Sequence, residues 1–251
     1  MEYNPYSLKG KTILVTGASS GIGQTTAIEC SKLGAKLVIT GRNKERLSKT
    51  LGSLMGEGHE MIVADLDDED VITSLANDVP QLDGVSCNAG ISVGTKPVNF
   101  YKKNDLEQMF QTNTLSAVLL IKALLKKKKF NKPSSLVVTS SIEGNFVTSI
   151  GNGMYGMTKA ALSSYARTVA LELAPKGVRC NAVTPGMVKT PLIVSDGDLT
   201  QEQLDADEAR YPLGRYGEPK DVAWAIIYLL SDASCWVTGT TLKIDGGISL
   251  L

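Results

Sequence analysis

Two hydrophobic periods alternate along the chain, and each change of period predicts a change of secondary structure. Short apolar runs without a polar face, such as Ile13-Leu14-Val15 and Leu136-Val137-Val138, are typical of parallel strands covered by helices on both sides. Strands are predicted at residues 12–15, 36–40, 61–64, 84–87, 135–140, 178–183 and 241–244. Apolar positions at helical spacing predict helices at residues 23–33, 44–54, 68–77, 105–127, 154–173 and 220–230.

This alternation predicts an α/β fold, a doubly wound (Rossmann) parallel β-sheet flanked by helices. The chain has no low-complexity tract, no linker rich in Pro, Gly or Ser and no short repeat. Residues 1–251 are therefore expected to form a single domain.

One segment, residues 187–216, breaks the pattern. It contains no predicted strand, and Pro191, Gly197, Pro212 and Gly214 interrupt its weak helical pieces. Long irregular inserts in compact folds are usually lids or binding loops, so we expect a substrate lid near residues 187–216. The segment is also acidic, through Asp196, Asp198, Glu202, Asp205, Asp207 and Glu208.

Composition narrows the classes of function. The 251 residues include 26 basic and 26 acidic side chains, and this balance argues against non-specific binding to nucleic acid or to anionic membranes. The longest apolar stretch, residues 115–125, contains Lys122 and is too short to span a bilayer. No Cys-x-x-Cys pair and no secretory leader are present, which predicts a reducing, cytoplasmic setting.

His59 is the one histidine of the chain. A single histidine argues against multi-histidine metal sites and against mechanisms that need a histidine pair, so no metal site is predicted. Acid–base chemistry must then come from other side chains.

A glycine-rich turn follows the first predicted strand and opens the first helix. Glycines at such a junction permit a tight turn and a close approach of phosphate, while the helix N-terminus offers unpaired N–H groups. Three glycines in the first βα unit predict a nucleotide phosphate site rather than an ordinary turn. The candidate residues are Gly17, Ser19, Ser20, Gly21, Ile22 and Gly23.

The end of the second strand bears on the choice of nucleotide. An acidic residue at this position would bind the ribose hydroxyls of NAD, whereas this chain has Arg42. A guanidinium matches a 2′-phosphate with charge-assisted hydrogen bonds, so NADP(H) is preferred over NAD(H). The alternative is that Arg42 is simply the first solvated residue of the next helix.

Tyr155 and Lys159 share one face at the start of the predicted helix 154–173, because they are four residues apart. A phenol has a pKa of about 10, and bringing it near neutrality takes about 4 kcal/mol of differential stabilisation. A neighbouring ammonium supplies stabilisation of this kind. Alone, this spacing is also common on helix surfaces.

Together these motifs resemble the classical short-chain dehydrogenase/reductase family, in the expected order over nearly the whole chain. The segment Thr16-Gly17-Ala18-Ser19-Ser20-Gly21-Ile22-Gly23 matches the cofactor turn of the family. Cys87-Asn88-Ala89-Gly90 matches its Asn-Asn-Ala-Gly element except at Cys87, for which we expect a small buried residue. Further matches are Asp65, Leu66, Asn113, Ser141, Tyr155, Lys159, Pro185, Gly186, Val188 and Thr190.

The resemblance implies hydride transfer between a nicotinamide cofactor and a ketone or secondary alcohol. It makes Asn113, Ser141, Tyr155 and Lys159 the catalytic residues. Ser141 would stabilise the substrate oxygen, Tyr155 would transfer its proton, Lys159 would lower the pKa of Tyr155 and bind ribose, and Asn113 would hold a water. The implied cofactor contacts add Asp65, Leu66, Asn88, Ala89, Gly90, Pro185, Gly186, Val188 and Thr190.

The substrate stays open at this stage, because function depends on the site and not on the fold. The sequence is most similar to 3-oxoacyl-[acyl-carrier-protein] reductases; hydroxysteroid, sugar-alcohol and small-ketone dehydrogenases are alternatives, and a non-catalytic dinucleotide sensor is a further one. Glu143 is either solvated or biases the pocket toward polar substrates. Relatives commonly form homotetramers, which is expected here too.

A lysine cluster follows the helix of Asn113. Reductases of the acyl-carrier type dock their acidic carrier with basic residues in this region, so the cluster is a candidate docking site. The alternative is that these lysines cap a helix C-terminus, whose dipole favours cations. The cluster consists of Lys126, Lys127, Lys128, Lys129 and Lys132.

Overall fold

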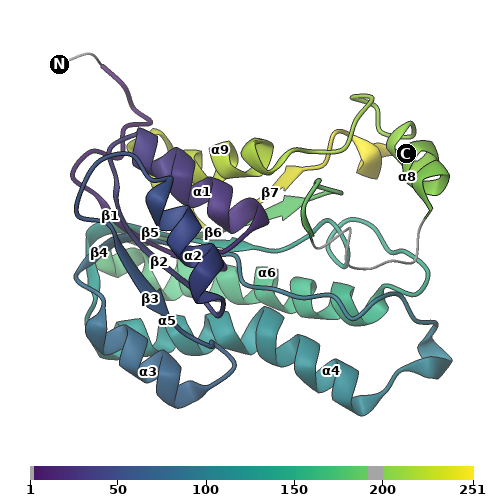
Figure 1. The fold of residues 1–251 in the computed structure, drawn as a ribbon, viewed down its shortest axis with the longest axis horizontal. Helices are drawn as coiled ribbons and strands as arrows, with labels where there is room; N and C mark the ends of the chain where they lie inside the picture. Colours follow the sequence, from purple (N-terminus) through teal and green to yellow (C-terminus); the bar gives the residue numbers. More distant parts are fainter. Residues whose placement is uncertain (1–2, 192–199) are drawn as a thin grey trace.

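A computed structural model describes residues 3–191 and 200–251 and contains one sheet of seven parallel strands (Figure 1). The strand order is β3-β2-β1-β4-β5-β6-β7, with the reversal of winding between β1 and β4. All seven predicted strands are present, in the predicted parallel arrangement. Their bounds are β1 Thr12–Thr16, β2 Lys36–Gly41, β3 Glu60–Val63, β4 Leu82–Cys87, β5 Phe130–Thr139, β6 Val178–Pro185 and β7 Thr241–Ile244.

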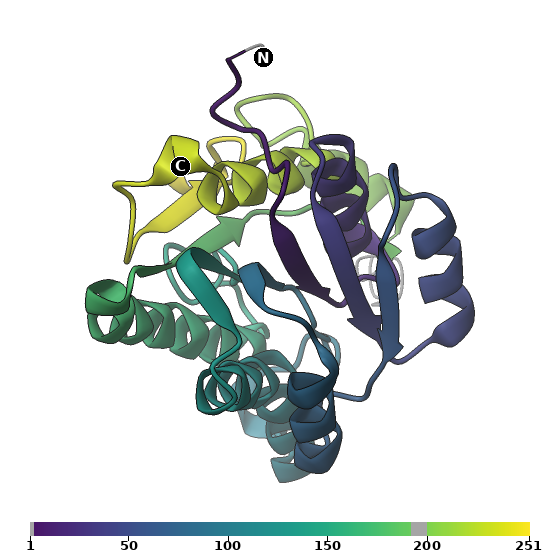
Figure 2. The same ribbon diagram turned by 90° about the vertical axis from the view of Figure 1, so that its left-hand side faces the viewer.

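Helices cover both faces of this sheet, and the view along the sheet shows the three layers (Figure 2). One face carries α1 (Gly21–Lys32), α2 (Lys44–Gly52) and α9 (Pro219–Leu230). The other carries α3 (Glu69–Asp78), α5 (Ser116–Lys126) and α6 (Gly153–Leu173). No helix within the described residues is long and apolar enough to span a membrane.

Two hydrophobic cores explain why the strands have no polar face. Leu14 and Val38 point into the core beneath α3, α5 and α6, whereas Ile13 and Leu37 point into the core beneath α1, α2 and α9. Successive strand side chains point to opposite faces, so a strand covered on both sides must be apolar at every position.

The predicted helix 105–127 is divided in the structure. It consists of α4 (Lys103–Phe110), a π-helical turn (Gln111–Leu115) and α5. Asn113 lies at the centre of this π turn. A π turn inserts one residue per turn and is often found at functional sites, and helical periodicity alone did not predict it.

The segment 187–216 contains one described helix, α8 (Gln201–Glu208), which begins with a capping box at Thr200. Glu208 accepts from the backbone N–H of Tyr216 and pairs with Lys189 at 2.8 Å. The Tyr216 hydroxyl donates to Asp207. These contacts tie α8 to the segment after β6, while residues 192–199 of the predicted lid, with Asp196 and Asp198, lie outside the described residues.

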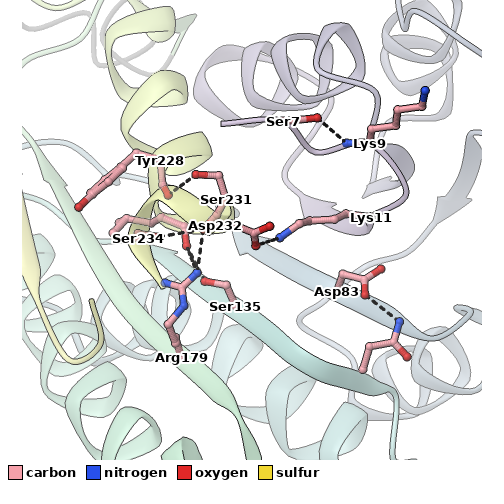
Figure 3. A network of polar contacts seen from close by, with 12 residues as sticks. Ser7, Lys9, Lys11, Asp83, Ser135, Arg179, Tyr228, Ser231, Asp232 and Ser234 are labelled. Atoms are coloured by element: carbon pink, nitrogen blue, oxygen red, sulfur yellow. Dashed lines mark hydrogen bonds and ion pairs between the residues drawn. The ribbon is translucent and has the colours of Figure 1, made fainter. Parts of the chain in front are cut away.

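Polar contacts fix the C-terminal end of α9 to the amino edge of the sheet (Figure 3). The Arg179 guanidinium donates to the carbonyl oxygens of Leu229 and Ser231, at 2.9 and 3.2 Å. Lys11 pairs with Asp232 at 2.6 Å. A cation at a helix C-terminus satisfies its last carbonyls, so this edge is a structural anchor, at the end of the strands away from the predicted site.

Candidate active site

A cleft of about 320 Å³ opens at the carboxyl ends of the strands. Ligands of open parallel sheets bind at this edge, where the winding reverses. Most of the predicted cofactor residues line it: Gly17, Ser19, Ser20, Gly21, Ile22, Gly23, Arg42, Asp65, Leu66, Asn88, Ala89, Gly90 and Thr190. The prediction missed these lining residues: Gly41, Asn43, Arg46, Ala64, Asp67, Thr112, Thr139 and Pro191.

The glycines of the first turn are required by backbone geometry. Gly17 has φ +63°, and a Cβ there would lie 2.9 Å from the backbone nitrogen of Ala89. A Cβ on Gly23 would lie 2.4 Å from the carbonyl oxygen of Gly17. The turn therefore packs against both β4 and its own helix, at distances that no side chain permits.

The N-terminus of α1 opens into the cleft. Ser20 is its N-cap residue, with extended backbone, and its side chain makes no capping hydrogen bond. The first N–H groups of a helix lack intrahelical partners and carry partial positive charge, which suits a phosphate. The open helix end and the close-packed glycines fit a dinucleotide pyrophosphate.

Two arginines stand at the end of the cleft beyond β2. Arg42 is more than half exposed, and its Nη1 lies 3.9 Å from Oδ2 of Asp67. Asn43 caps α2 by accepting from the backbone N–H of Arg46. Arg46 follows Arg42 by four residues and lines the same cleft, a spacing that sequence reasoning could have used.

Asn88, directly after β4, lines the floor of the cleft. The Asn88 amide donates to the hydroxyl and carbonyl oxygens of Ser86, and its Oδ1 accepts from Thr139 at 2.6 Å. Its backbone N–H donates to Thr16. Cys87 is buried in the core, which raises the pKa of its thiol to about 12, so it is the small buried residue that was expected.

Lys159 is buried on α6 and reaches the carboxyl end of β5. Its Nζ donates to the carbonyl oxygen of Thr139 at 3.0 Å and lies 5.6 Å from the centre of the Tyr155 ring. Burial lowers the pKa of Lys159 to about 8, because removal from water disfavours the ammonium. Gly90 makes room for this group, since a Cβ there would lie 3.3 Å from Nζ.

The Asn113 side chain forms three hydrogen bonds to protein groups. Its Oδ1 accepts from the backbone N–H of Ile91 at 2.7 Å, and its amide donates to the Ile91 carbonyl oxygen and to the Thr158 hydroxyl. The π turn thereby joins the segment after β4 to α6, next to Lys159.

Ser141 and Tyr155 are both partly exposed and come from different elements. Ser141 follows β5, and its Oγ accepts from the backbone N–H of Glu143 at 3.1 Å. Tyr155 lies in the first turn of α6. All four predicted catalytic residues thus lie in or beside the segments that follow the carboxyl ends of β4 and β5.

Glu143 is buried, so the interpretation that it is solvated is wrong. Its carboxylate accepts from the backbone N–H and from the hydroxyl of Ser149, each at 2.8 Å. The next residue, Gly144, has φ +76° and packs against the backbone of Gly156, directly after Tyr155. Glu143 therefore closes the loop of residues 141–149 and holds it against α6.

Three predicted cofactor residues, Pro185, Gly186 and Val188, do not line the cleft. Pro185 ends β6, and its carbonyl oxygen accepts from the N–H of Ile142. Gly186 donates to the carbonyl oxygen of Ile244, and Val188 is buried in the core beneath α9. No group of three or more His, Cys, Asp and Glu within the described residues could hold a metal ion.

Comparison with known proteins shows similarity to reductases and dehydrogenases. The family model described as enoyl-(acyl carrier protein) reductase matches residues 17–249. A 3-oxoacyl-[acyl-carrier-protein] reductase of Rickettsia felis is 33% identical over 244 residues, 97% of this chain and 99% of that protein. A glucose 1-dehydrogenase of Gluconobacter oxydans is 32% identical over 248 residues, 96% of this chain and 92% of that protein.

A solved structure extends the likeness to three dimensions. It is a short-chain dehydrogenase/reductase family protein that is 35% identical, with a TM-score of 0.86. The match covers 98% of this chain and all of the other.

Proposed function

The chain belongs to the short-chain dehydrogenase/reductase family of oxidoreductases, which bind NAD(P) and act on CH–OH groups, and from this premise we propose that it is an NADPH-dependent reductase of 3-oxoacyl thioesters borne by an acyl carrier protein. The observation that carries the proposal is the position of buried Lys159 beside the Tyr155 ring at the carboxyl end of β5, in a chain 33% identical to a reductase of that class.

The cofactor supplies a hydride to the substrate carbon when bound. The glycine turn and the uncapped end of α1 would hold its pyrophosphate, and Lys159 its nicotinamide ribose. Arg42 and Arg46 carry the charge that a 2′-phosphate requires. Arg42→Asp is expected to weaken NADPH binding more than NADH binding; unchanged affinities, or NADH binding as tight as NADPH binding in the native protein, would contradict the preference.

Residues of the chain would stabilise the substrate oxygen and transfer a proton to it. Ser141 would donate a hydrogen bond to the substrate oxygen, stabilising charge as it develops. Tyr155 would give its proton to that oxygen as general acid. The ammonium of Lys159, close to the Tyr155 ring, would stabilise the phenolate that results. Asn113 contributes by holding the segment after β4 and α6 together.

The lysine cluster stays a candidate docking site for an acidic carrier protein. It lies at the amino edge of the sheet, since β5 begins at Phe130 and the Lys129 carbonyl oxygen accepts from the N–H of Leu82, the first residue of β4. This edge is opposite the cleft, a position that counts in favour of the capping alternative. Lys129 also donates to the carbonyl oxygens of Asn77 and Val79 at the end of α3, which favours the capping alternative for that one residue.

The decisive experiment follows NADPH consumption with acetoacetyl groups on acyl carrier protein and on a small thiol. Lys126→Glu together with Lys127→Glu, both exposed, should slow the carrier-borne substrate and spare the small one. Equal effects on both substrates would remove the docking role. Failure of both substrates would remove the proposed substrate class.

Sugar oxidation is the second candidate, because the glucose 1-dehydrogenase is almost as similar as the reductase. Reduction of NADP⁺ by glucose or gluconate, without activity toward 3-oxoacyl thioesters, would establish it. A complete set of Asn113, Ser141, Tyr155 and Lys159 favours an enzyme over a dinucleotide sensor. Absence of turnover on every class of ketone and alcohol, with intact NADPH binding, would favour the sensor.

We also infer a homotetramer. Leu115 at the end of the π turn and Leu171 on α6 are exposed, as are Trp236 and Leu250 near the C-terminus, and exposed apolar side chains of this kind suit contacts between subunits. Light scattering at micromolar concentration tests this; a monomer would contradict it. The cytoplasmic setting stays a prediction.

A further inference from the structure

Asp67 is an acidic residue at the end of the cleft where the two arginines stand. It follows β3 and is the second residue after Asp65, whose carboxylate accepts from its backbone N–H at 3.1 Å. Its side chain is about one-third exposed and lines the cleft together with Arg42 and Arg46. A carboxylate on the wall of a site proposed to bind a phosphate is unfavourable for that phosphate, because the two groups carry charge of the same sign.

The position of Asp67 is fixed by the π turn. Its Oδ2 accepts from the Thr112 hydroxyl at 2.8 Å, and its carbonyl oxygen accepts from the Gln111 side chain at 3.0 Å. Thr112 is itself buried, so this contact is protected from water. These hydrogen bonds therefore hold the Asp67 carboxylate in a fixed position on the wall of the cleft.

The same Oδ2 lies 3.9 Å from Nη1 of Arg42. This distance allows charge attraction but is too long for a hydrogen bond, so the donors of the guanidinium stay available to a ligand. The carboxylate thus leaves these donors free, but its negative charge offsets part of the attraction of Arg42 for a phosphate and repels that phosphate directly. Toward an unphosphorylated ribose it has the opposite effect, because it can accept a hydrogen bond from a hydroxyl.

We propose that Asp67 is a specificity-determining residue of the cofactor site: it weakens the preference for a 2′-phosphorylated dinucleotide that Arg42 and Arg46 create, so that the site also accepts NADH. This inference rests on the proposed binding of a nicotinamide dinucleotide in the cleft. It assigns opposite roles to two side chains that face each other across one end of the site.

The test measures equilibrium dissociation constants of NADPH and NADH for the full chain, by fluorescence of the bound cofactor. Asp67→Asn removes the charge and keeps an oxygen for the Thr112 hydroxyl. We expect it to bind NADPH about fivefold tighter, with NADH unchanged or weaker, as the loss of one like charge near a phosphate predicts. The gain should shrink at about 0.5 M salt, which a purely structural change would not cause.

Glu69→Gln is the matched control, because it removes the same charge two residues away. Glu69, the first residue of α3, pairs with the exposed Lys122 of α5 and does not line the cleft. An unchanged ratio of NADPH to NADH affinity in this variant supports a local effect at Asp67; an equal rise would overturn it. Asp67→Ser, which also lacks the charge, provides a second variant if the amide disturbs folding.

Arg42→Ala separates this inference from the proposed cofactor preference. If Arg42→Ala lowers the affinity ratio and Asp67→Asn fails to raise it, Asp67 has no role in specificity and the preference stands. If Arg42→Ala has no effect, the preference through Arg42 fails. In that case a raised ratio in Asp67→Asn still supports direct repulsion of the phosphate, and an unchanged ratio overturns the inference.

Discussion

Replacing the buried Lys159 with methionine is predicted to stabilise the protein while abolishing its activity. Burial lowers the pKa of Lys159 from its ordinary value of 10.5 to about 8. A tenfold change in a protonation equilibrium is worth about 1.4 kcal/mol, so keeping the ammonium in the folded state costs about 3 kcal/mol near neutral pH. Methionine fills a similar volume without a charge, although it leaves the Thr139 carbonyl oxygen without its donor, a loss of about 1 kcal/mol.

The pH dependence isolates the charge from the change in packing. Between pH 8 and 10.5 the unfolded chain binds more protons at Lys159 than the folded chain does, so the free energy of unfolding rises with pH in this window. Below this window the full cost applies, and above it the cost disappears. The wild-type protein should therefore gain about 2 kcal/mol relative to Lys159→Met between about pH 7 and pH 9.5.

Urea unfolding of both proteins without cofactor, at these two pH values, measures this difference. The comparison with the variant cancels the titration of groups that both proteins share. If the difference in free energy of unfolding between the two proteins is the same at both pH values, the folded state does not disfavour the Lys159 ammonium. Loss of turnover in a more stable variant would show that the buried charge is kept for function at a cost in stability.

Three further variants test the site. Tyr155→Phe should still bind NADPH with near-normal affinity while turnover falls at least a hundredfold, because the phenol is the proton donor; retained turnover in a stopped-flow assay would defeat the assignment. Gly23→Ala should lose several kcal/mol of stability and most cofactor affinity in urea unfolding and binding titrations, since its Cβ would lie 2.4 Å from the Gly17 carbonyl oxygen; a wild-type melting curve would refute this close packing. Glu143→Ala should lower stability by about 2 kcal/mol, because it leaves the Ser149 N–H and hydroxyl without an acceptor, whereas Glu143→Gln should recover part of it; equal melting temperatures for all three proteins would show that the loop does not depend on this contact.

The order of elements could be predicted because its causes are local. A strand covered on both faces must be apolar at each position, and a helix with one buried face must repeat every 3.6 residues, so the alternation along the chain is itself the signal. The glycine turn was predictable for a similar reason, since only glycine accepts the φ of Gly17 or the contact of Gly23. Both constraints act on residues close together in the chain.

The sequence did not predict contacts between distant segments. The π turn that centres on Asn113 depends on hydrogen bonds to Ile91 and Thr158, which come from a loop and a helix on either side of it. The buried carboxylate of Glu143 depends on two hydrogen bonds that Ser149 donates to it, whereas the sequence alone left Glu143 open between a solvated and a substrate-binding role.

The sequence by itself determined the layered parallel sheet and its glycine turn, because each follows from the spacing of side chains along one segment. Only the tertiary structure decided which charged groups are buried and which of them lie close to one another. It buried Lys159 beneath β5, which lowers the pKa of its ammonium, and brought Asp67 within 3.9 Å of Arg42. Electrostatic energy depends on distance and on exclusion of water, and both are set when β2, β3, β5 and α6 pack together.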